Sequence, residues 1–379
     1  MHRHCNIHCT IWSWSSEDRR WSRRGRTTRA SCGDGHRRKQ GDLSMAMKFG
    51  LACVSFQKHP DDERSFEQIY DDLLDLAVLA EQVGFDSFWL SEHHGVPDGW
   101  LPSLMPVAAA IAARTTSLRI GTGIAVAPFY DPIRLAEDAA VLDILSKGRF
   151  DLGLAVGYRQ EEFETFGVKR SERGGRLDEI VEILRAAWRG PVDHHGKYYS
   201  YDGVDVTPKP GSKTVPIYLG GIAEEAVMRA ARGADGFLSS GTSDFETLAE
   251  RIDKVRAAGA RDDLDVCVTK YCFVDRDGDA WGKYKKSYDY IHRLYVALTS
   301  GELEGLYSAS SDDAAIRESL QQEAAILGTP AEVYEQIRRM QDRIGDFHFH
   351  PRMWLPGIGR KEAETAIRTF GDDVISRFR

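Results

Sequence analysis

The sequence predicts an α/β fold, a (β/α)8 TIM barrel with insertion segments. From Met47 onward, short runs rich in β-branched and aromatic residues alternate with longer segments that carry apolar residues at helical spacing. This alternation is typical of a parallel sheet whose strands are connected by helices. We expect eight strands with helices between them, which favours a closed barrel over an open, doubly wound sheet.

The first half of the chain contains four βα units. The first helix segment places Ile69, Leu73 and Leu76 on one face and ends before Gly84, a residue type that commonly follows helices. The expected strands cover residues 48–55, 85–90, 118–126 and 149–156, and the expected helices cover 66–83, 105–113, 133–145 and 177–188. A polar loop with glycine is expected between the fourth strand and its helix.

The second half interrupts this alternation once. Residues 194–210 carry alternating aromatic residues and Gly203, which predicts a β-hairpin inserted between barrel strands. The remaining strands are expected at 215–219, 236–238, 266–274 and 347–353, and a last helix is expected over 363–370. The connection 278–328 is long, so we expect it to hold a helix and a mobile lid.

Residues 1–44 differ in composition from the rest. They contain nine arginines but almost no aliphatic residues at helical or strand spacing, so they cannot form a core. We expect a disordered or mis-started extension over 1–44 and a barrel domain over 45–379, with Met45 or Met47 as the natural start. The extension offers metal ligands without a second pair at zinc-finger spacing, so no metal site is predicted from His2, His4, Cys5, His8 and Cys9.

The overall composition narrows the functional class. The net charge of -8 and the pI of about 5.9 provide no positive field for phosphate backbones, which argues against a nucleic-acid partner. No apolar run approaches the ~20 residues of a membrane helix, so no membrane partner is expected. The six cysteines show no disulfide spacing. The sequence therefore predicts a cytoplasmic protein.

Several short motifs follow the expected strands, at the end of a barrel where catalytic residues lie. In chain order they are Ser91-Glu92-His93-His94, Gly121-Thr122-Gly123-Ile124, residues 145–153, residues 163–167, Leu219-Gly220-Gly221 and Leu355-Pro356-Gly357. Their order and spacing resemble the bacterial-luciferase-like flavin monooxygenases, a superfamily that also includes F420-dependent oxidoreductases. The resemblance covers nearly all of the chain after Met47.

The resemblance implies a catalytic role for His93, the first histidine of its Glu-His-His motif. A histidine at the top of the second strand can donate a hydrogen bond to an oxygenated flavin or exchange a proton with it near neutral pH. The alternative is that His93 and His94 only satisfy each other or Glu92 within the loop. Glu92 is expected to orient the loop. Adjacent residues at a strand end point in opposite directions, so no metal site is predicted here.

The resemblance also implies which residues contact the cofactor. A cis peptide bond is expected between Gly123 and Ile124, against the flavin ring, although an ordinary glycine in a tight strand would also explain Gly123. The turn Gly220-Gly221-Ile222 precedes a helix beginning near 223–225, so its N–H groups can bind a phosphate. The alternative is that these glycines only permit the turn. In the phosphate-binding interpretation, Glu224 and Glu225 must point to solvent.

One departure from the best-known luciferases concerns the cofactor phosphate. Where those proteins carry Cys-Arg, this chain has Ala155-Val156, so an arginine that would bind the phosphate of FMN is missing. Tyr158 and Arg159 could compensate, and their Gly-Tyr-Arg pattern resembles branches of the family that include F420 enzymes. Ala155 and Tyr158 are therefore expected beside the cofactor.

Three functions are compatible with these motifs. The leading hypothesis is a monooxygenase that uses O2 and reduced FMN, supplied by a separate reductase, on a small organic substrate. The alternatives are an F420-dependent hydride-transferring oxidoreductase, with a histidine at the same place as acid or base, and a non-catalytic flavin-binding barrel. In either enzyme the cofactor would carry the difficult chemistry.

The sequence also suggests a substrate pocket and a subunit interface. His94, Trp100, His350 and Trp354 are expected to line the pocket, with core or interface packing as the alternative for the tryptophans. A homodimer is expected through the second and third helices, where small and apolar residues are frequent. These residues are Met105, Val107, Ala109, Ile111 and those of 135–145.

Overall fold

The computed structural model describes residues 11–13, 22–24, 47–239, 243–300, 318, 320 and 325–379. The chain divides into two units, Met1–Leu43 and Ser44–Arg379. In the first unit, strands β1 (Ile11–Ser13) and β2 (Ser22–Arg24) form an antiparallel pair.

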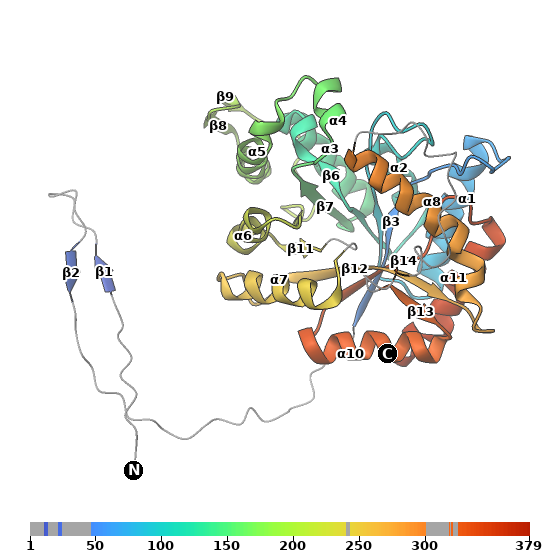
Figure 1. Ribbon diagram of the computed structural model, residues 1–379. Helices are drawn as coiled ribbons and strands as arrows, with labels where there is room; N and C mark the ends of the chain where they lie inside the picture. Colours follow the sequence, from blue (N-terminus) through green and yellow to red (C-terminus); the bar gives the residue numbers. More distant parts are fainter. Residues whose placement is uncertain are drawn as a thin grey trace, which may run out of the picture. The chain divides into compact units, whose positions relative to one another are not determined.

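In its described residues, the second unit is a closed barrel of eight parallel strands, which confirms the predicted (β/α)8 fold (Figure 1). Around the barrel they are β3 (Lys48–Val54), β4 (Ser87–Leu90), β5 (Arg119–Thr122), β7 (Phe150–Ala155), β10 (Ile217–Gly220), β11 (Gly236–Leu238), β12 (Asp265–Val274) and β14 (His348–Arg352). Pairing of β14 with β3 and of β7 with β10 completes the ring. The expected strand 118–126 is divided into β5 and the short β6 (Ala125–Val126), which pairs with β7.

Helices surround the strands. They are α1 (Phe66–Gln82), α2 (Leu104–Arg114), α3 (Pro132–Ser146), α5 (Arg173–Ala187), α6 (Glu224–Gly233), α7 (Phe245–Ala257), α8 (Ala280–Ser300), α10 (Pro330–Ile344) and α11 (Arg360–Asp373). Local sequence sets several starts: Ser65 forms a capping box with Gln68, and the Asp131 carboxylate accepts the first N–H groups of α3. Within the described ranges, no helix is both long and apolar enough to cross a membrane.

The insertions occur largely where the sequence predicts them. The antiparallel strands β8 (Val192–His195) and β9 (Ser200–Val204) confirm the hairpin. The loop after β7 contains an unexpected helix, α4 (Gln160–Thr165), and a strand β13 (Ile326–Gly328) pairs with β12. Helix α8 confirms the helix expected in 278–328, whereas the expected lid lies mostly in 301–317 and 321–324, outside the described residues.

Large aromatic rings fill the middle of the barrel. Trp89 of β4 and Tyr218 of β10 point inward, with their ring centroids 5.1 Å apart. A Cβ at Gly121 would lie 2.2 Å from the indole of Trp89, and one at Gly236 would lie 2.0 Å from the ring of Tyr218. The neighbouring strands therefore carry glycine where these rings need space.

A cluster of polar side chains, joined by hydrogen bonds, occupies the amino-terminal end of the barrel. The carboxylate of Asp265 lies 3.3 Å from Nδ1 of His348 and accepts the hydroxyl of Tyr218 at 3.0 Å. Nε2 of His348 lies 3.0 Å from Oγ of Ser87, which also accepts the indole N–H of Trp89. Because this end is packed, a ligand has to approach from the carboxyl ends of the strands.

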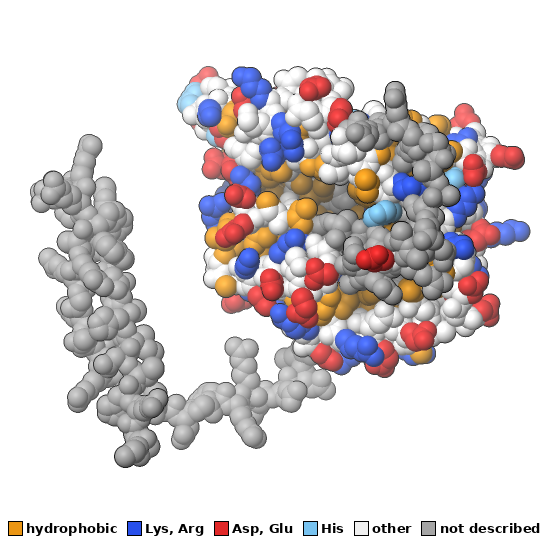
Figure 2. Space-filling model, in the orientation of Figure 1, with side chains coloured by type: hydrophobic (Ala, Val, Ile, Leu, Met, Phe, Trp, Pro, Cys, Tyr) orange, Lys and Arg blue, Asp and Glu red, His pale blue; other side chains and the backbone are white. Residues whose placement is uncertain are grey.

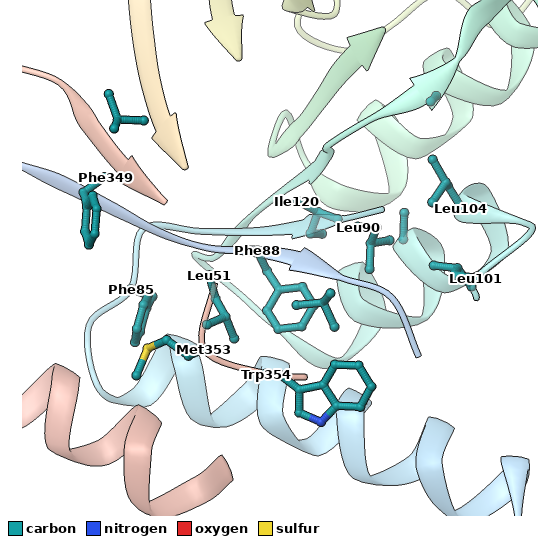
Figure 3. Packing of buried hydrophobic residues seen from close by; sticks show 14 of the residues in the cluster. Leu51, Phe85, Phe88, Leu90, Leu101, Leu104, Ile120, Phe349, Met353 and Trp354 are labelled. Atoms are coloured by element: carbon teal, nitrogen blue, oxygen red, sulfur yellow. The ribbon is translucent and has the colours of Figure 1, made fainter. Parts of the chain in front are cut away.

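The outward-facing residues of the strands pack against the helices. Leu51, Phe88 and Phe349 alternate with the inward-facing residues and belong to one buried hydrophobic cluster (Figure 3). Trp354, only 3% exposed, belongs to the same cluster. The structure thus places Trp354 in the core beside the strands, which is the packing alternative for this residue.

The face expected to form a dimer is only partly exposed. Val107 and Ile111 of α2 are 8% and 0% exposed, because they pack inside their own chain. On α3, Val141, Ile144 and Leu145 are 42%, 42% and 55% exposed. A surface groove between these helices is lined by residues that include Met105, Ala109, Val141 and Leu145.

Candidate functional site

The loop after β4 brings His93 to the carboxyl end of the barrel. The residue is 7% exposed, and Nδ1 of its imidazole lies 2.8 Å from Oε1 of Glu162. The same carboxylate oxygen accepts the backbone N–H of His94 at 2.9 Å. Because a carboxylate only accepts hydrogen bonds, this contact holds a proton on Nδ1 and leaves Nε2 as the nitrogen available for chemistry.

Glu162 belongs to α4, the helix that the sequence did not predict. Burial alone would raise its pKa, but the hydrogen bond and charge of His93 and the N–H of His94 hold the pKa below its ordinary value. Arg159, 3.9 Å away, acts in the same direction. The structure therefore places an ionised carboxylate behind His93.

Aromatic residues surround the other side of the His93 ring. The hydroxyl of Tyr158 lies 3.4 Å from Nε2 of His93, and the ring of Trp100 packs edge-on at 4.4 Å between centroids. Tyr158 is 38% exposed, and burial of its hydroxyl raises its pKa, so the group stays protonated and can donate. The structure thus brings three of the predicted site residues together, His93, Trp100 and Tyr158.

His94 points to a different environment. Its ring packs edge-on against Phe129 and Phe166, with centroid distances of 5.9 and 4.6 Å, and its Nε2 lies 3.3 Å from Glu92. Glu92 also accepts the N–H of Val126 at 2.6 Å and the hydroxyl of Tyr130. These contacts show Glu92 orienting the loop, as expected, and place His94 away from Tyr158 and Trp100.

Two of the predicted cofactor residues lie at the end of β5. The peptide bond between Gly123 and Ile124 is cis, as the resemblance implies. Both residues are partly exposed, whereas the residues before and after them are buried. A Cβ at Gly220 would lie 2.7 Å from Cδ1 of Ile124, so the ends of β5 and β10 approach each other across the barrel mouth.

The turn before α6 has the features that the phosphate-binding interpretation requires. Gly221 has a φ of +152°, and a Cβ there would lie 2.5 Å from the Cβ of Ala226. No side chain caps the N-terminus of α6, and Glu224 and Glu225 are exposed. Ile222 is 53% exposed, and hydrophobic side chains gather over α6, β7 and β11 in Figure 2. Backbone N–H groups here are available to an anion.

Arg159, unlike this turn, is not available to bind a phosphate. It is 6% exposed, its Nη1 donates to the carbonyl of His94 at 2.5 Å, and its Nε lies 3.3 Å from Glu161. The guanidinium thus holds the His94 loop against α4. Ala155 is the last residue of β7 and is partly exposed, so it lies at the mouth without contributing a charge.

His350 lies inside the barrel, beneath the mouth. It is 1% exposed, its ring packs 4.9 Å from Trp89, and burial lowers its pKa well below the ordinary value. One ring nitrogen of His350, one of His348 and the sulfur of Cys267 lie within 4.8 Å of one another, a ligand set for a soft metal. We assign no metal here, because both nitrogens of His348 already contact Ser87 and Asp265.

Comparison with known proteins identifies the family. Residues 47–346 match the family model described as luciferase-like monooxygenase. The chain belongs to the luciferase-like monooxygenase family.

The relatives of this luciferase-like chain include proteins named as monooxygenases and as F420-dependent dehydrogenases. The F420-dependent glucose-6-phosphate dehydrogenase of Microbacterium testaceum is 30% identical over 359 residues, covering 89% of this chain and 99% of the relative. The alkanal monooxygenase alpha chain of Aliivibrio fischeri is 31% identical over 273 residues, covering 68% and 76%. The oxygenase component of flavin-dependent trigonelline monooxygenase from Acinetobacter baylyi is 34% identical over 166 residues, 43% of this chain and 46% of the relative. This chain therefore spans less than half of that relative.

A solved structure shows the same architecture. The monooxygenase RslO1 from Streptomyces bottropensis has a TM-score of 0.76 and 26% identity, covering 88% of this chain and 100% of its own. With relatives named as monooxygenases and dehydrogenases, this luciferase-like chain is an enzyme of the oxidoreductase class. The relatives include both flavin-dependent and F420-dependent proteins.

The sequence patterns did not predict the contact of Glu162 with His93. Acidic residues at the start of a helix are usually solvated, and Glu161 is indeed exposed. The available signal was the adjacent Phe163, an apolar residue that indicates one buried face of a short helix. Which of the two neighbouring glutamates turns inward depends on the helix start, and α4 itself was not predicted.

Proposed function

We propose that this chain is a flavin-dependent monooxygenase that acts on a small organic substrate with O2 and reduced FMN. The observation that carries this proposal is the His93–Glu162 pair at the barrel mouth, with Nε2 of His93 next to Tyr158. Reduced FMN would supply the electrons that activate O2. The chain supplies the position, the proton donors and the exclusion of water.

The residues at the mouth fit a flavin with a phosphate group. The partly exposed Gly123 and Ile124 offer a flat, apolar edge, and Gly220, Gly221 and Ile222 offer backbone N–H groups at an uncapped helix. Ala155 and Tyr158 complete the wall between these two places. The steric limits at Gly220 and Gly221 show that this turn has no room for side chains.

His93 performs the proton transfer in this proposal. Glu162 keeps a proton on Nδ1, so Nε2 can accept a proton from the substrate or return one to it. The protonated hydroxyl of Tyr158 can donate toward the same point. Trp100 packs against the imidazole and restricts its rotation, so the nitrogen stays aimed at the mouth.

An F420-dependent, hydride-transferring oxidoreductase is the second candidate. The F420-dependent relative from Microbacterium testaceum matches over 99% of its length, and Ala155-Val156 removes the arginine expected for FMN phosphate. In that function His93 would be the acid or base beside the transferred hydride.

The monooxygenase proposal includes partners that complete the reaction. A separate flavin reductase would deliver reduced FMN, since one relative is named as the oxygenase component of a flavin-dependent monooxygenase. The protein would act in the cytoplasm as a homodimer, without nucleic-acid or membrane partners. His94 and His350, with Trp100, would shape the substrate pocket from the wall and floor of the mouth.

Replacement of His93 tests the proposal. In the His93→Ala variant, reduced FMN should bind within about threefold of wild type, because the imidazole is not part of the phosphate site. The bound flavin should be reoxidised by O2 faster, with more hydrogen peroxide released, when followed by stopped-flow absorbance. His195→Ala, at an exposed histidine of the β8–β9 hairpin, is the control and should behave as wild type. Unchanged reoxidation in His93→Ala would exclude His93 from the oxygen reaction.

A further inference from the structure

Arg352 is a buried arginine that has no acidic partner in the part of the chain that the structure describes. It is the last residue of β14 and is 5% exposed. Its strand places it inward: His348 and His350 face the barrel interior, and residues at intervals of two share one side of a strand. Arg352 therefore points into the mouth above His350, in register with Tyr271 of β12.

One edge of the guanidinium is already bound. Nη1 lies 3.0 Å from the hydroxyl of Tyr271 and 3.2 Å from that of Tyr295. The same two rings lie 5.0 and 5.4 Å from the centre of the guanidinium. These contacts fix the plane of the group and stabilise its charge. Both hydrogen-bond contacts involve Nη1 and not the opposite edge of the guanidinium.

The opposite edge consists of Nε and Nη2, and both atoms are buried without a hydrogen-bond partner among the described residues. This edge presents two parallel N–H bonds, the arrangement that binds both oxygens of a planar carboxylate. Arg159 provides the contrast within the chain, because that equally buried guanidinium contacts Glu161 and Glu162. A buried cation with an open donor edge, and with no carboxylate near it in the described ranges, is stabilised by an anion from outside.

The position of Arg352 indicates which molecule brings this anion. On the barrel, β14 lies across from β7, whereas the proposed flavin contacts come from β5, β7 and the turn after β10. From Arg352 the aromatic lining continues through Tyr295 to Trp100, 5.3 Å apart, and then to His93. If the anionic group of a molecule binds Arg352, the rest of that molecule would thus extend toward His93 along these aromatic rings.

We propose that Arg352 is a specificity-determining residue that binds the carboxylate of a small organic acid, with the apolar body of that substrate against Tyr295 and Trp100. The identity of the reaction in this inference rests on the proposed function, whereas the binding of a carboxylate by Arg352 does not. The proposed substrates are small carboxylic acids with an aromatic or unsaturated body.

Benzoate and benzamide test the inference in flavin-free protein. They have nearly the same shape and differ in charge, so titration calorimetry or ligand-observed NMR should show benzoate binding at least tenfold more tightly to wild type. Arg352→Gln should remove this preference. Arg352→Lys, which keeps the charge but not the fork, should retain part of it and covers the case that the glutamine variant does not fold. Arg189→Gln, at an exposed residue just after the end of α5, is the control and should match wild type.

Two results would overturn the inference. One is equal binding of benzoate and benzamide to wild type, and the other is a benzoate preference that survives in Arg352→Gln. A parallel titration with reduced FMN separates the two proposals. Loss of benzoate binding with retained flavin affinity confirms a substrate site, whereas loss of flavin affinity alone in Arg352→Gln would assign the arginine to the cofactor instead.

Discussion

At the scale of single residues, the proposed chemistry of His93 depends on Glu162. The 2.8 Å contact joins a buried carboxylate to Nδ1, which selects one tautomer and one ring orientation. The backbone N–H of His94 shares the same oxygen, so the carboxylate also fixes the loop that carries the histidine. Glu162 is thus a positioning residue for His93.

Glu162→Gln should separate positioning from binding. An amide in place of the carboxylate keeps the shape but removes the charge that holds the proton on Nδ1, so the imidazole can take the other tautomer. We expect reoxidation of bound reduced FMN to shift at least halfway toward the rate of His93→Ala, with flavin affinity unchanged. Glu162→Asp should restore part of the wild-type behaviour. A glutamine variant that behaves as wild type would contradict this role.

At the scale of elements, the start of α6 provides the proposed phosphate site. The turn bears glycines where a Cβ would clash, and the helix begins without a side-chain cap. Both features leave backbone N–H groups open toward the mouth. The site therefore consists of backbone, and its affinity should depend on the geometry of the turn.

Gly221→Ala tests this part of the site. The added Cβ would meet the Cβ of Ala226 at 2.5 Å, so the turn has to shift and the N–H groups lose their alignment. We expect the variant to bind FMN about tenfold or more weakly, whereas riboflavin, which lacks the phosphate, should bind as in wild type. Gly233→Ala, at the other end of α6 with open space around it, is the control. Equal losses for FMN and riboflavin would exclude a phosphate role.

The junction between α1 and β5 gives a pH-dependent prediction. Burial raises the pKa of Glu81, but hydrogen bonds from the backbone N–H groups of Ser117, Leu118 and Thr116 outweigh it and lower the pKa to about 2. An unfolded glutamate titrates near ~4.3, so the carboxylate stabilises the fold above that pH and loses this contribution as the pH falls toward 2.

Glu81→Gln should therefore lower the unfolding free energy by about 1 kcal/mol at pH 7, a value reduced by the partial exposure of the group. The difference from wild type should shrink when urea unfolding is repeated at pH 4 and below. Glu67→Gln, on the exposed first turn of the same helix, should change stability little at either pH. A Glu81→Gln difference that stays constant with pH would contradict the linkage.

The elements also show what the sequence could predict. Strands and helices were predictable because each barrel unit repeats one pattern, and His93 and the cis peptide at Gly123 follow from motifs next to strands. Glu162 and Arg352 were not predictable in the same way. Each acts through a partner more than fifty residues away in the chain, His93 for Glu162 and Tyr271 or Tyr295 for Arg352. Spacing within a segment carries no information about such contacts.

At the scale of the whole molecule, an apolar face on α3 remains without a partner among the described residues. Val141, Ile144 and Leu145 are each more than 40% exposed, next to the groove shared with α2. Burial of this face against a second copy would form a symmetric interface. We therefore retain the proposal of a homodimer, with α3 as its main contributor.

Leu145→Asp should convert the dimer into a monomer, because a charge placed in a self-complementary apolar interface has no partner. The result is read by sedimentation equilibrium at micromolar concentration. Val296→Asp on α8 is the matched control, since Val296 is 56% exposed and Leu145 is 55% exposed. Wild-type protein that sediments only as a monomer would refute the interface.

We propose that the barrel mouth binds reduced FMN and presents it to His93. The most direct test of this proposal is anaerobic equilibrium titration of the purified protein with reduced FMN and, separately, with F420. We predict that reduced FMN binds at micromolar concentration or below, at least tenfold more tightly than F420 in either oxidation state. Tight binding of F420 without measurable binding of reduced FMN would contradict it and would establish the hydride-transferring alternative.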